Sequence, residues 1–375
     1  MSRTCRDQLW QPSEVDALDR ILAQRLSIQG LASSKSSVAD IVRTLMCVQS
    51  QDAPLARWSL AMRTGFPGDP AITAAIDSGE IIRTHILRPT WHYVLPQDLL
   101  WLLDLTSPKV LRSMAARHRQ LALEDPHVVR REHDGIAQLL SGGNFLSRRA
   151  IQTLLGREDM RGERLGHLLM IAELQGLICS GPLADGQHTY ALVEERIDPM
   201  PAPDRDSATQ ELVRRFFIGH GPASVPHLVR WTNLTKTEIR GALSDLGDQL
   251  TSTSLKGEEL WHAPNLPDPG SGKGAFLLQL FDEAFLTYPG SNFPRVPDHP
   301  SGDRPLSVAE AGGGVVISDL RDVGWWKRKE SGRATRVTFA LAPSLTKRAR
   351  SDIEAQAEAL AAHTNRSLDL TYLDP

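Results

Sequence analysis

Two glutamines stand one residue apart in the segment Gln49-Ser50-Gln51-Asp52-Ala53-Pro54. Helical apolar periodicity fills residues 38–47 and resumes at 54–62, where Asp52 suits a helix cap and Pro54 suits the first turn. The pair therefore falls at a joint between two helices. If the joint is extended, residues two apart point the same way. Two neutral amides can then hold one water molecule by accepting and donating together, although glutamine also commonly satisfies backbone groups at helix ends.

A second set of reactive side chains lies in two expected strands, 81–87 and 90–94, which flank Arg88-Pro89. Its members are Arg83, His85, Arg88 and His92. They suit contacts to the phosphates or bases of a nucleic acid. The alternative is that strand alternation turns Thr84, Ile86 and Trp91 inward and leaves the other side chains in solvent. We expect no metal site at His85 and His92, because no third ligand lies at a suitable spacing.

Three other motifs have weaker chemistry. Asp282 and Glu283 form an acidic pair, but adjacent residues of a strand face opposite ways, so a shared two-carboxylate site is not expected. The Gly312-Gly313-Gly314 run lacks the context of a phosphate-binding loop and is expected to be a tight turn. Lys327, Arg328 and Lys329 follow two tryptophans and could bind the DNA backbone, although a solvated charged face has the same pattern.

Composition limits the class of protein. The 375 residues are 41% hydrophobic and 23% charged, as in an ordinary globular protein, and their length suggests two to four units. Three widely spaced cysteines, with no C-x-x-C pair, fit a reduced cytoplasmic protein without structural zinc. The polar N-terminus has no visible signal peptide, and no apolar run suggests a membrane span, so no membrane partner is expected.

The net charge of −3 hides an uneven distribution. Between Arg321 and Arg350 nine Lys or Arg residues stand against two acids. A second group of arginines occupies positions 112–131. Basic regions on a nearly neutral chain are typical of a phosphate-binding surface, and equally of a solvated face.

The order of expected elements repeats along the chain. They include a helix that opens at 96–105, a helix capped by Ser207, and a helix opened by a capping box of Thr235 and Glu238. Helices, a glycine and then a strand-turn-strand recur at 1–125, 126–200 and 205–263, with a linker rich in Pro and Asp at 198–206. Helix-turn-helix followed by a hairpin is the winged-helix arrangement, so we predict an α+β protein with tandem winged-helix units. Residues 264–375 change character to β-type runs with a helix at 346–362, which predicts a separate β-rich C-terminal domain.

Several segments, in order, resemble the AlkZ/YcaQ-type winged-helix DNA glycosylases, a bacterial group that repairs alkylated and crosslinked bases. They cover most of the chain and are Val48–Asp52, Arg83–His92, Arg164–Met170, His220–Ser224, Leu280–Glu283, Gly312–Gly314 and Gly324–Arg328. The catalytic signature of that family is Gln, an aliphatic residue, then Gln or Asp. Gln49 and Gln51 match its polar positions, and Ser50 departs from the aliphatic one. The resemblance implies three winged helices that form a basic DNA cradle.

The implied reaction is excision of N-alkylated purines, with unhooking of interstrand crosslinks a further possibility. A base alkylated at N7 or N3 is cationic and leaves readily, so the enzyme must position water at the sugar C1′ and stabilise an oxocarbenium-like transition state. From the sequence we expect Gln51 to fix the water through its amide and Gln49 to orient Gln51 or to share the water, with no metal and no cofactor. The expected partner is alkylated double-stranded DNA, bound by a monomer.

Two other functions fit the same sequence. One is a non-catalytic winged-helix DNA-binding protein, such as a regulator or a lesion sensor. The other is a scaffold whose winged helices bind proteins. Release of a base from alkylated DNA separates the enzyme from both, and salt-dependent DNA binding separates the scaffold from the other two.

Overall fold

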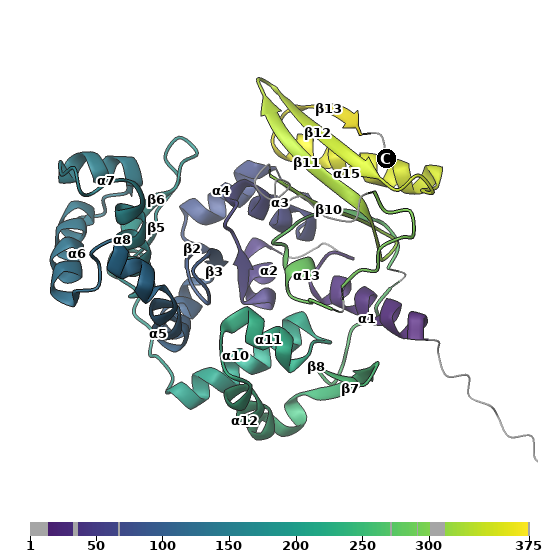
Figure 1. Cartoon of the computed structure of the whole chain (residues 1–375), viewed down its shortest axis with the longest axis horizontal. Helices are drawn as coiled ribbons and strands as arrows, with labels where there is room; N and C mark the ends of the chain where they lie inside the picture. Colours follow the sequence, from purple (N-terminus) through teal and green to yellow (C-terminus); the bar gives the residue numbers. More distant parts are fainter. Residues whose placement is uncertain are drawn as a thin grey trace, which may run out of the picture.

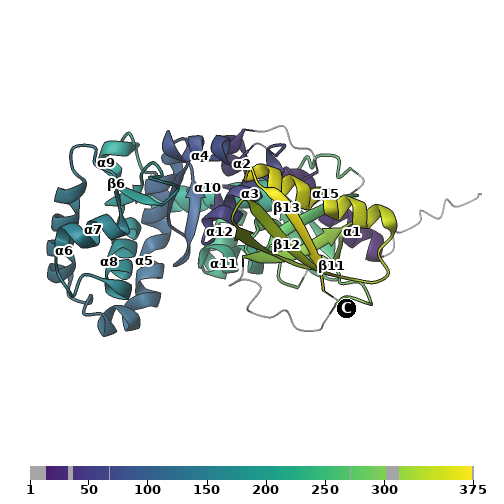
Figure 2. The same cartoon turned by 90° about the horizontal axis from the view of Figure 1, so that it is seen from above.

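The structure is a computed structural model that describes residues 14–32, 37–66, 68–270, 272–290, 292–300 and 312–373. Cys5 lies outside these ranges. Figure 2 shows an elongated molecule, with the helices α6, α7 and α8 at one end and the C-terminal sheet with helix α15 at the other. No described helix combines the length and the apolar composition needed to cross a bilayer.

The first part of the chain forms a small sheet surrounded by helices. Its elements are α1 (Glu14–Ile28), α2 (Val38–Leu45), β1 (Cys47–Gln49), α3 (Ala53–Arg63), α4 (Asp69–Asp77), β2 (Ile82–His85), β3 (Trp91–Val94) and α5 (Pro96–Gln120). The strands are ordered β1-β3-β2, and both pairs are antiparallel. β1 is therefore an edge strand, and the glutamine pair begins at its last residue.

The second part repeats this arrangement. Its elements are α6 (Pro126–Leu140), β4 (Leu146–Ser147), α7 (Arg148–Leu155), α8 (Gly162–Leu174), β5 (Ile178–Ser180), β6 (Thr189–Leu192) and α9 (Val193–Arg196). The strand order β4-β6-β5 matches that of the first sheet. Ser147 caps α7 by accepting from the Ala150 N–H, and Gly156 ends the helix in the left-handed conformation.

The third part has the same order with a shortened first strand. It contains α10 (Arg205–His220), α11 (Val225–Thr232), α12 (Lys236–Leu246), the 3-10 turn Gly247–Gln249, β7 (Thr251–Leu255) and β8 (Glu258–His262). A single bridge between Ala223 and Trp261 stands where the other two sheets have a first strand paired with their last. Thr235 and Glu238 form the expected capping box of α12.

The C-terminal part is a five-stranded sheet ordered β13-β12-β11-β10-β9. Its elements are β9 (Ala275–Gln279), α13 (Glu283–Leu286), β10 (Gly313–Ser318), β11 (Arg321–Ser331), β12 (Ala334–Leu341), α15 (Lys347–His363) and β13 (Ser367–Tyr372). β13 runs parallel to β12, whereas the other neighbours are antiparallel. Figure 1 shows this sheet beside α1 and α3, and Leu22, Leu26 and Trp58 share one core with Val315 and Trp326.

Four local expectations are wrong. The helix expected at 38–47 ends at Leu45, because Met46 has a φ of 65° and Cys47 begins β1. The helix expected at 96–105 continues to Gln120 through Pro108. Asp204, and not Ser207, caps α10. Finally, the glycine run is not simply a turn, because Gly313 and Gly314 lie in β10. A Cβ added to Gly313 would lie 2.1 Å from the Trp326 carbonyl oxygen, and one added to Gly314 would lie 1.8 Å from the Leu278 carbonyl oxygen.

Candidate functional site

β1 fixes the first glutamine of the pair. β1 pairs antiparallel with β3, which places Gln49 opposite His92. One residue later the Ser50 N–H donates to the Trp91 carbonyl at 2.7 Å, so the extended pairing continues into the motif. The joint between α2 and α3 is therefore a short strand, in which alternate backbone N–H groups point toward and away from β3.

Gln49 lies inside the protein. It is 3% exposed, and its backbone N–H donates to Glu283 Oε1 at 3.0 Å. Its side-chain Oε1 is buried and accepts no hydrogen bond from any described residue. An unpaired buried acceptor costs about 1–3 kcal/mol, which a hydrogen-bond donor such as water would recover. Gln49 therefore offers a carbonyl oxygen that is not used by the fold.

Gln51 has a different environment. Its side chain is exposed, and its Oε1 accepts from the Trp91 backbone N–H at 3.3 Å. Since that partner is a donor, the Gln51 oxygen faces the protein and leaves its NH₂ group as a donor for other partners. The neighbouring Asp52 caps α3 by accepting from the Leu55 N–H at 3.1 Å. That is the structural role considered for it from the sequence.

Arg83 binds the backbone of the glutamine segment. Its Nε and one terminal nitrogen donate to the Ser50 carbonyl at 3.2 and 2.9 Å, and its guanidinium lies 4.3 Å from the centroid of the Trp91 ring. Burial lowers its pKa, and nearby Tyr93 and Glu173 act in the opposite direction. The side chain is 7% exposed. In this conformation Arg83 holds the motif and does not reach toward solvent.

His85 and Trp91 share one buried carboxylate. His85 Nδ1 lies 2.5 Å from Glu173 Oε2, and the Trp91 Nε1–H donates to Glu173 Oε1 at 3.1 Å. Glu173 comes from α8 in the second part of the chain and is fully buried. The Arg83 backbone N–H donates to Ser180 Oγ of β5 at 2.8 Å. The hairpin that supports Gln51 is thus anchored to the second part.

His92 forms a hydrogen-bonded pair with Arg88 in which the imidazole is neutral. His92 is fully buried, and burial and nearby Arg88 lower its pKa well below the usual value. A neutral ring can donate from Nδ1 to the Thr90 carbonyl at 3.0 Å and accept from Arg88 at Nε2 at 3.2 Å. Burial also lowers the pKa of Arg88, and Glu283 is the largest charge that counters this effect. His92 therefore holds the arginine at the hairpin tip.

Strand alternation was one reason to expect the four arginine and histidine side chains of the hairpin in solvent. The structure shows that this expectation is wrong. Arg83, His85 and His92 are buried together with Thr84 and Ile86, and Arg88 is half-buried. The tip also contacts the third part of the chain, because Asn233 donates to the Leu87 carbonyl at 3.3 Å. The hairpin is consequently enclosed by its neighbours on both sides.

Asp282 and Glu283 face different partners, as expected, but they stand at the start of the helix α13 and not in a strand as the sequence argument assumed. Asp282 caps α13 and accepts a two-pronged ion pair from Arg63 of α3 at 2.7 and 3.0 Å, and a bond from Ser59 at 2.7 Å. Glu283 binds the Gln49 backbone and Trp231 instead. Both carboxylates therefore join the C-terminal part to the earlier parts of the chain.

The basic segment in β11 is divided by strand alternation. Lys329 is exposed and Lys327 half-exposed, whereas the Arg328 side chain is only 10% exposed, with Glu330 3.5 Å away. Burial lowers the pKa of Arg328, and Asp52 of the glutamine segment is the largest counteracting charge. Arg328 is thus packed between the C-terminal sheet and the start of α3, while the two lysines are the accessible members.

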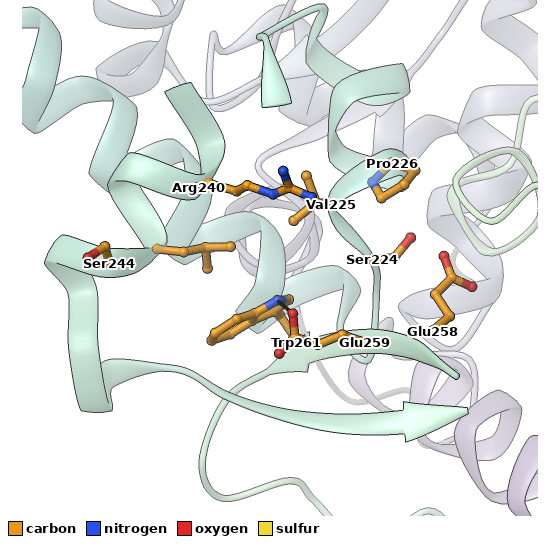
Figure 3. A pocket seen from close by; sticks show the side chains of 9 residues that line it. Ser224, Val225, Pro226, Arg240, Ser244, Glu258, Glu259 and Trp261 are labelled. Atoms are coloured by element: carbon orange, nitrogen blue, oxygen red, sulfur yellow. Dashed lines mark hydrogen bonds between the residues drawn. The ribbon is translucent and has the colours of Figure 1, made fainter. Parts of the chain in front are cut away.

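A cleft apart from the glutamine segment lies in the third part of the chain. It has a volume of about 470 Å³ and lies between α12, the start of α11 and β8. Figure 3 shows Arg240 and Trp261 on facing sides of it, with Glu258 and Glu259 on the strand. None of its lining residues is among those predicted from the sequence. Within the described residues, no three His, Cys, Asp or Glu side chains gather as a metal site would require.

Sequence reasoning missed the residues that position the others. Glu173 lies 82 residues along the chain from Trp91, Ser180 lies 97 from Arg83, and Trp231 lies 52 from Glu283. Each stands in an apolar helix or strand without a motif. A charged residue inside an apolar helix, as Glu173 is in α8, is the one signal that could have been noticed, because buried carboxylates require partners.

Comparisons with known proteins agree on one family. The sequence profile described as "DNA glycosylase AlkZ-like" matches residues 42–363. The "Interstrand DNA cross-link repair glycosylase" of Streptomyces sahachiroi is 26% identical over 331 residues, which cover 82% of this chain and 87% of that protein. The solved structure of "Streptomyces sahachiroi DNA glycosylase AlkZ" superposes with a TM-score of 0.71 at 21% identity, covering 95% of this chain and 99% of that one.

Proposed function

Because the chain belongs to the AlkZ-like family of DNA glycosylases, we propose that it hydrolyses the N-glycosidic bond of N-alkylated, cationic purines in double-stranded DNA. Its relative from Streptomyces sahachiroi is named for repair of interstrand crosslinks. We extend the proposal to unhooking of such crosslinks by the same site. The enzyme would act as a monofunctional glycosylase that releases a base and leaves an abasic sugar, in the cytoplasm and as a monomer.

The DNA-binding scaffold in this proposal is a set of three winged helices. The order helix, strand, helix, helix, strand, strand occurs in the first two parts, where the first strand pairs with the last; in the third part the single bridge between Ala223 and Trp261 takes the place of the first strand. We assign the units to residues 1–125, 126–200 and 205–263, followed by the β-rich domain at 264–375. The assignment accounts for the shared strand orders β1-β3-β2 and β4-β6-β5.

The chemistry requires little acid–base catalysis. Alkylation at N7 or N3 gives the purine a positive charge, so the base leaves as a neutral molecule without prior protonation. The sugar then passes through an oxocarbenium-like state as the C1′–N bond breaks; water attacks C1′, and its proton passes to bulk water. A site of this kind must place the water and avoid repelling the developing cation. Neutral amides meet both requirements.

The environments of the two glutamines favour a division of labour. Gln49 has the unused acceptor, its buried Oε1, and can take a hydrogen bond from the attacking water. Gln51 has its oxygen engaged with Trp91 and its NH₂ group free, so it can donate to the same water or to the substrate. This division reverses the roles expected from the sequence, in which Gln51 fixed the water. Both residues remain the proposed catalytic pair.

Contacts with DNA are proposed for the accessible cations. Lys327 and Lys329 of β11 are suitable for phosphates, and we propose that the half-buried Arg88 contacts the lesion, because it binds His92, the residue that pairs with Gln49. Arg83, His85 and His92 are buried here, so their contribution to lesion binding is to hold the hairpin. Arg328 contributes in the same way, by packing beside Asp52.

The unused Oε1 of Gln49 carries the proposal, and base release tests it directly. Duplex DNA containing N7-methylguanine is incubated with the protein in EDTA, and free base is measured by chromatography. We expect the wild-type chain to release the base and Gln49→Ala to lose this activity. Gln152→Ala, which changes an exposed glutamine of α7, should release the base as the wild type does. A wild-type chain that binds the duplex but releases no base would support the non-catalytic DNA-binding protein instead.

A further inference from the structure

We infer that Glu283 is a positioning residue for the glutamine pair, through which the C-terminal domain holds the catalytic strand in place. This inference rests on the proposed function, because it concerns how Gln49 is placed for the reaction. The sequence did not predict Glu283 as a site residue, so the inference gives its carboxylate a new role.

Glu283 joins three parts of the chain. It is the first residue of α13, directly after Asp282, and is 1% exposed. Its Oε1 accepts the Gln49 backbone N–H at 3.0 Å. Its Oε2 accepts the Trp231 Nε1–H of α11 at 3.0 Å and the Thr287 hydroxyl at 3.2 Å. Both oxygens are therefore fully engaged inside the protein.

The bond to Gln49 has a specific structural reason. β1 is an edge strand that pairs with β3 on one side only. The Ser50 N–H points toward β3 and meets the Trp91 carbonyl, so the Gln49 N–H points away from the sheet. A buried backbone N–H requires an acceptor. Glu283 supplies one where a further strand would otherwise be needed.

The position of this acceptor matters for catalysis more than for folding. Gln49 carries the proposed water-binding Oε1 on the same residue whose N–H is held. The hydrogen bond to Glu283 ties the end of β1 to α13 and so limits the movement of the strand end. A displacement of about 1 Å at a reacting centre lowers rates by about 10²-fold.

The neighbouring bonds of Glu283 provide matched controls. Thr287→Val keeps the side-chain shape and removes one bond to Oε2, while the bond to Gln49 stays intact. Glu283→Gln combined with Trp231→Phe keeps a carbonyl oxygen for Gln49 and removes the Trp231 N–H that would oppose the new amide NH₂. Asp282 is left unchanged throughout, because it secures Arg63.

The experiment compares single-turnover base release from N7-methylguanine DNA, the dissociation constant for the same duplex, and the thermal midpoint. Glu283→Ala is expected to lower the rate by about 10²-fold with duplex affinity unchanged, because the buried carboxylate cannot contact phosphate. Thr287→Val is expected to keep the wild-type rate. Glu283→Gln/Trp231→Phe is expected to recover most of the rate, and it keeps the test valid if Glu283→Ala does not fold.

Three outcomes would overturn the inference. The first is a wild-type rate in folded Glu283→Ala. The second is an equal loss of rate in Glu283→Ala and Thr287→Val. The third is a double variant as slow as Glu283→Ala, which would mean that the negative charge is needed and not the hydrogen bond. Gln49→Ala is measured alongside: if it excises normally, the proposed function fails, and if it is inactive while Glu283→Ala is normal, only this inference fails.

Discussion

Gln49 and Gln51 are chemically identical, and their surroundings make them different. One is buried with an unused carbonyl oxygen, and the other is exposed with its oxygen bound to a backbone N–H. Residue spacing predicted that the two amides would act together. It could not predict which amide oxygen is available, because that depends on β3, which follows about 40 residues later in the chain.

Alanine substitution of each glutamine tests this difference. Gln49→Ala is expected to lower the excision rate by about 10²–10³-fold, since one positioned hydrogen-bonding group at the reacting centre is removed. Gln51→Ala is expected to have the smaller effect. Gln51→Glu loses the NH₂ donor but is expected to retain activity, because one carboxylate oxygen keeps the bond from the Trp91 N–H and the other can accept a hydrogen bond from the water, as the Asp of the family motif would. Single-turnover kinetics on alkylated DNA measures the excision rate of all three variants. If Gln49→Ala excises at the wild-type rate, the glutamine pair does not act in catalysis.

Ser50 departs from the aliphatic residue of the family motif, and its surroundings suggest that the departure is tolerated. Its side chain is fully buried, and its Oγ has no hydrogen-bond partner among the described residues. A buried unpaired hydroxyl costs about 1–3 kcal/mol. Ser50→Ala is therefore expected to be neutral or stabilising in urea unfolding and to excise at the wild-type rate. A clear loss of excision with unchanged stability would show that the hydroxyl takes part in the reaction.

At the scale of single elements, the sequence predicted local structure well and its context poorly. The boundaries of α7, α12, β5 and β6 follow from caps, glycines and turn residues that act over a few positions. The extension of α5 past Pro108 and the burial of Gly313 and Gly314 in β10 depend on packing against distant segments. Short-range rules do not contain that information.

The strand β11 illustrates the same limit and leads to a prediction. Three consecutive cations suggest one phosphate-binding patch, but alternation buries Arg328 and exposes Lys329. Replacing Lys327 and Lys329 with Gln should weaken duplex binding and reduce the slope of log affinity against log salt by about 0.9 for each phosphate that the variant no longer neutralises. Arg328→Gln should mainly lower thermal stability. Fluorescence titrations at several salt concentrations make the comparison, and an unchanged slope in the lysine variant would remove β11 from the interface.

At the scale of the whole molecule, buried polar residues connect parts that the sequence shows as separate. Arg63 with Asp282, Glu283 with Gln49, and Glu173 with His85 each join segments at least 88 residues apart. The sequence indicated the number of parts and their order. It could not indicate how they are joined, since a buried ion pair has no local signature. The candidate site is formed at these junctions, and the predicted hairpin turned out to be enclosed by them.

Buried histidines make the stability of the molecule depend on pH. Burial lowers the pKa of His188 to about 3 and that of His227 to about 4, and it also lowers those of His92 and His220. In the unfolded chain a histidine has a pKa of about 6.5. Below that pH the unfolded chain binds protons that the folded chain does not, so the free energy of unfolding falls as the pH falls.

The size of the effect can be tested with one variant. At pH 5 each histidine kept neutral by the fold costs about 2 kcal/mol, and above about pH 7.5 the cost disappears. Urea unfolding at pH 7.5, 6 and 5 should therefore show a steep loss of stability. His188→Gln removes one titrating group whose two ring nitrogens lack hydrogen-bond partners among the described residues. The variant should make the free energy of unfolding depend less steeply on pH, and the dependence that remains should come from the other buried histidines. If the variant and the wild type lose stability equally as the pH falls, His188 takes up a proton in the folded protein as it does in the unfolded chain.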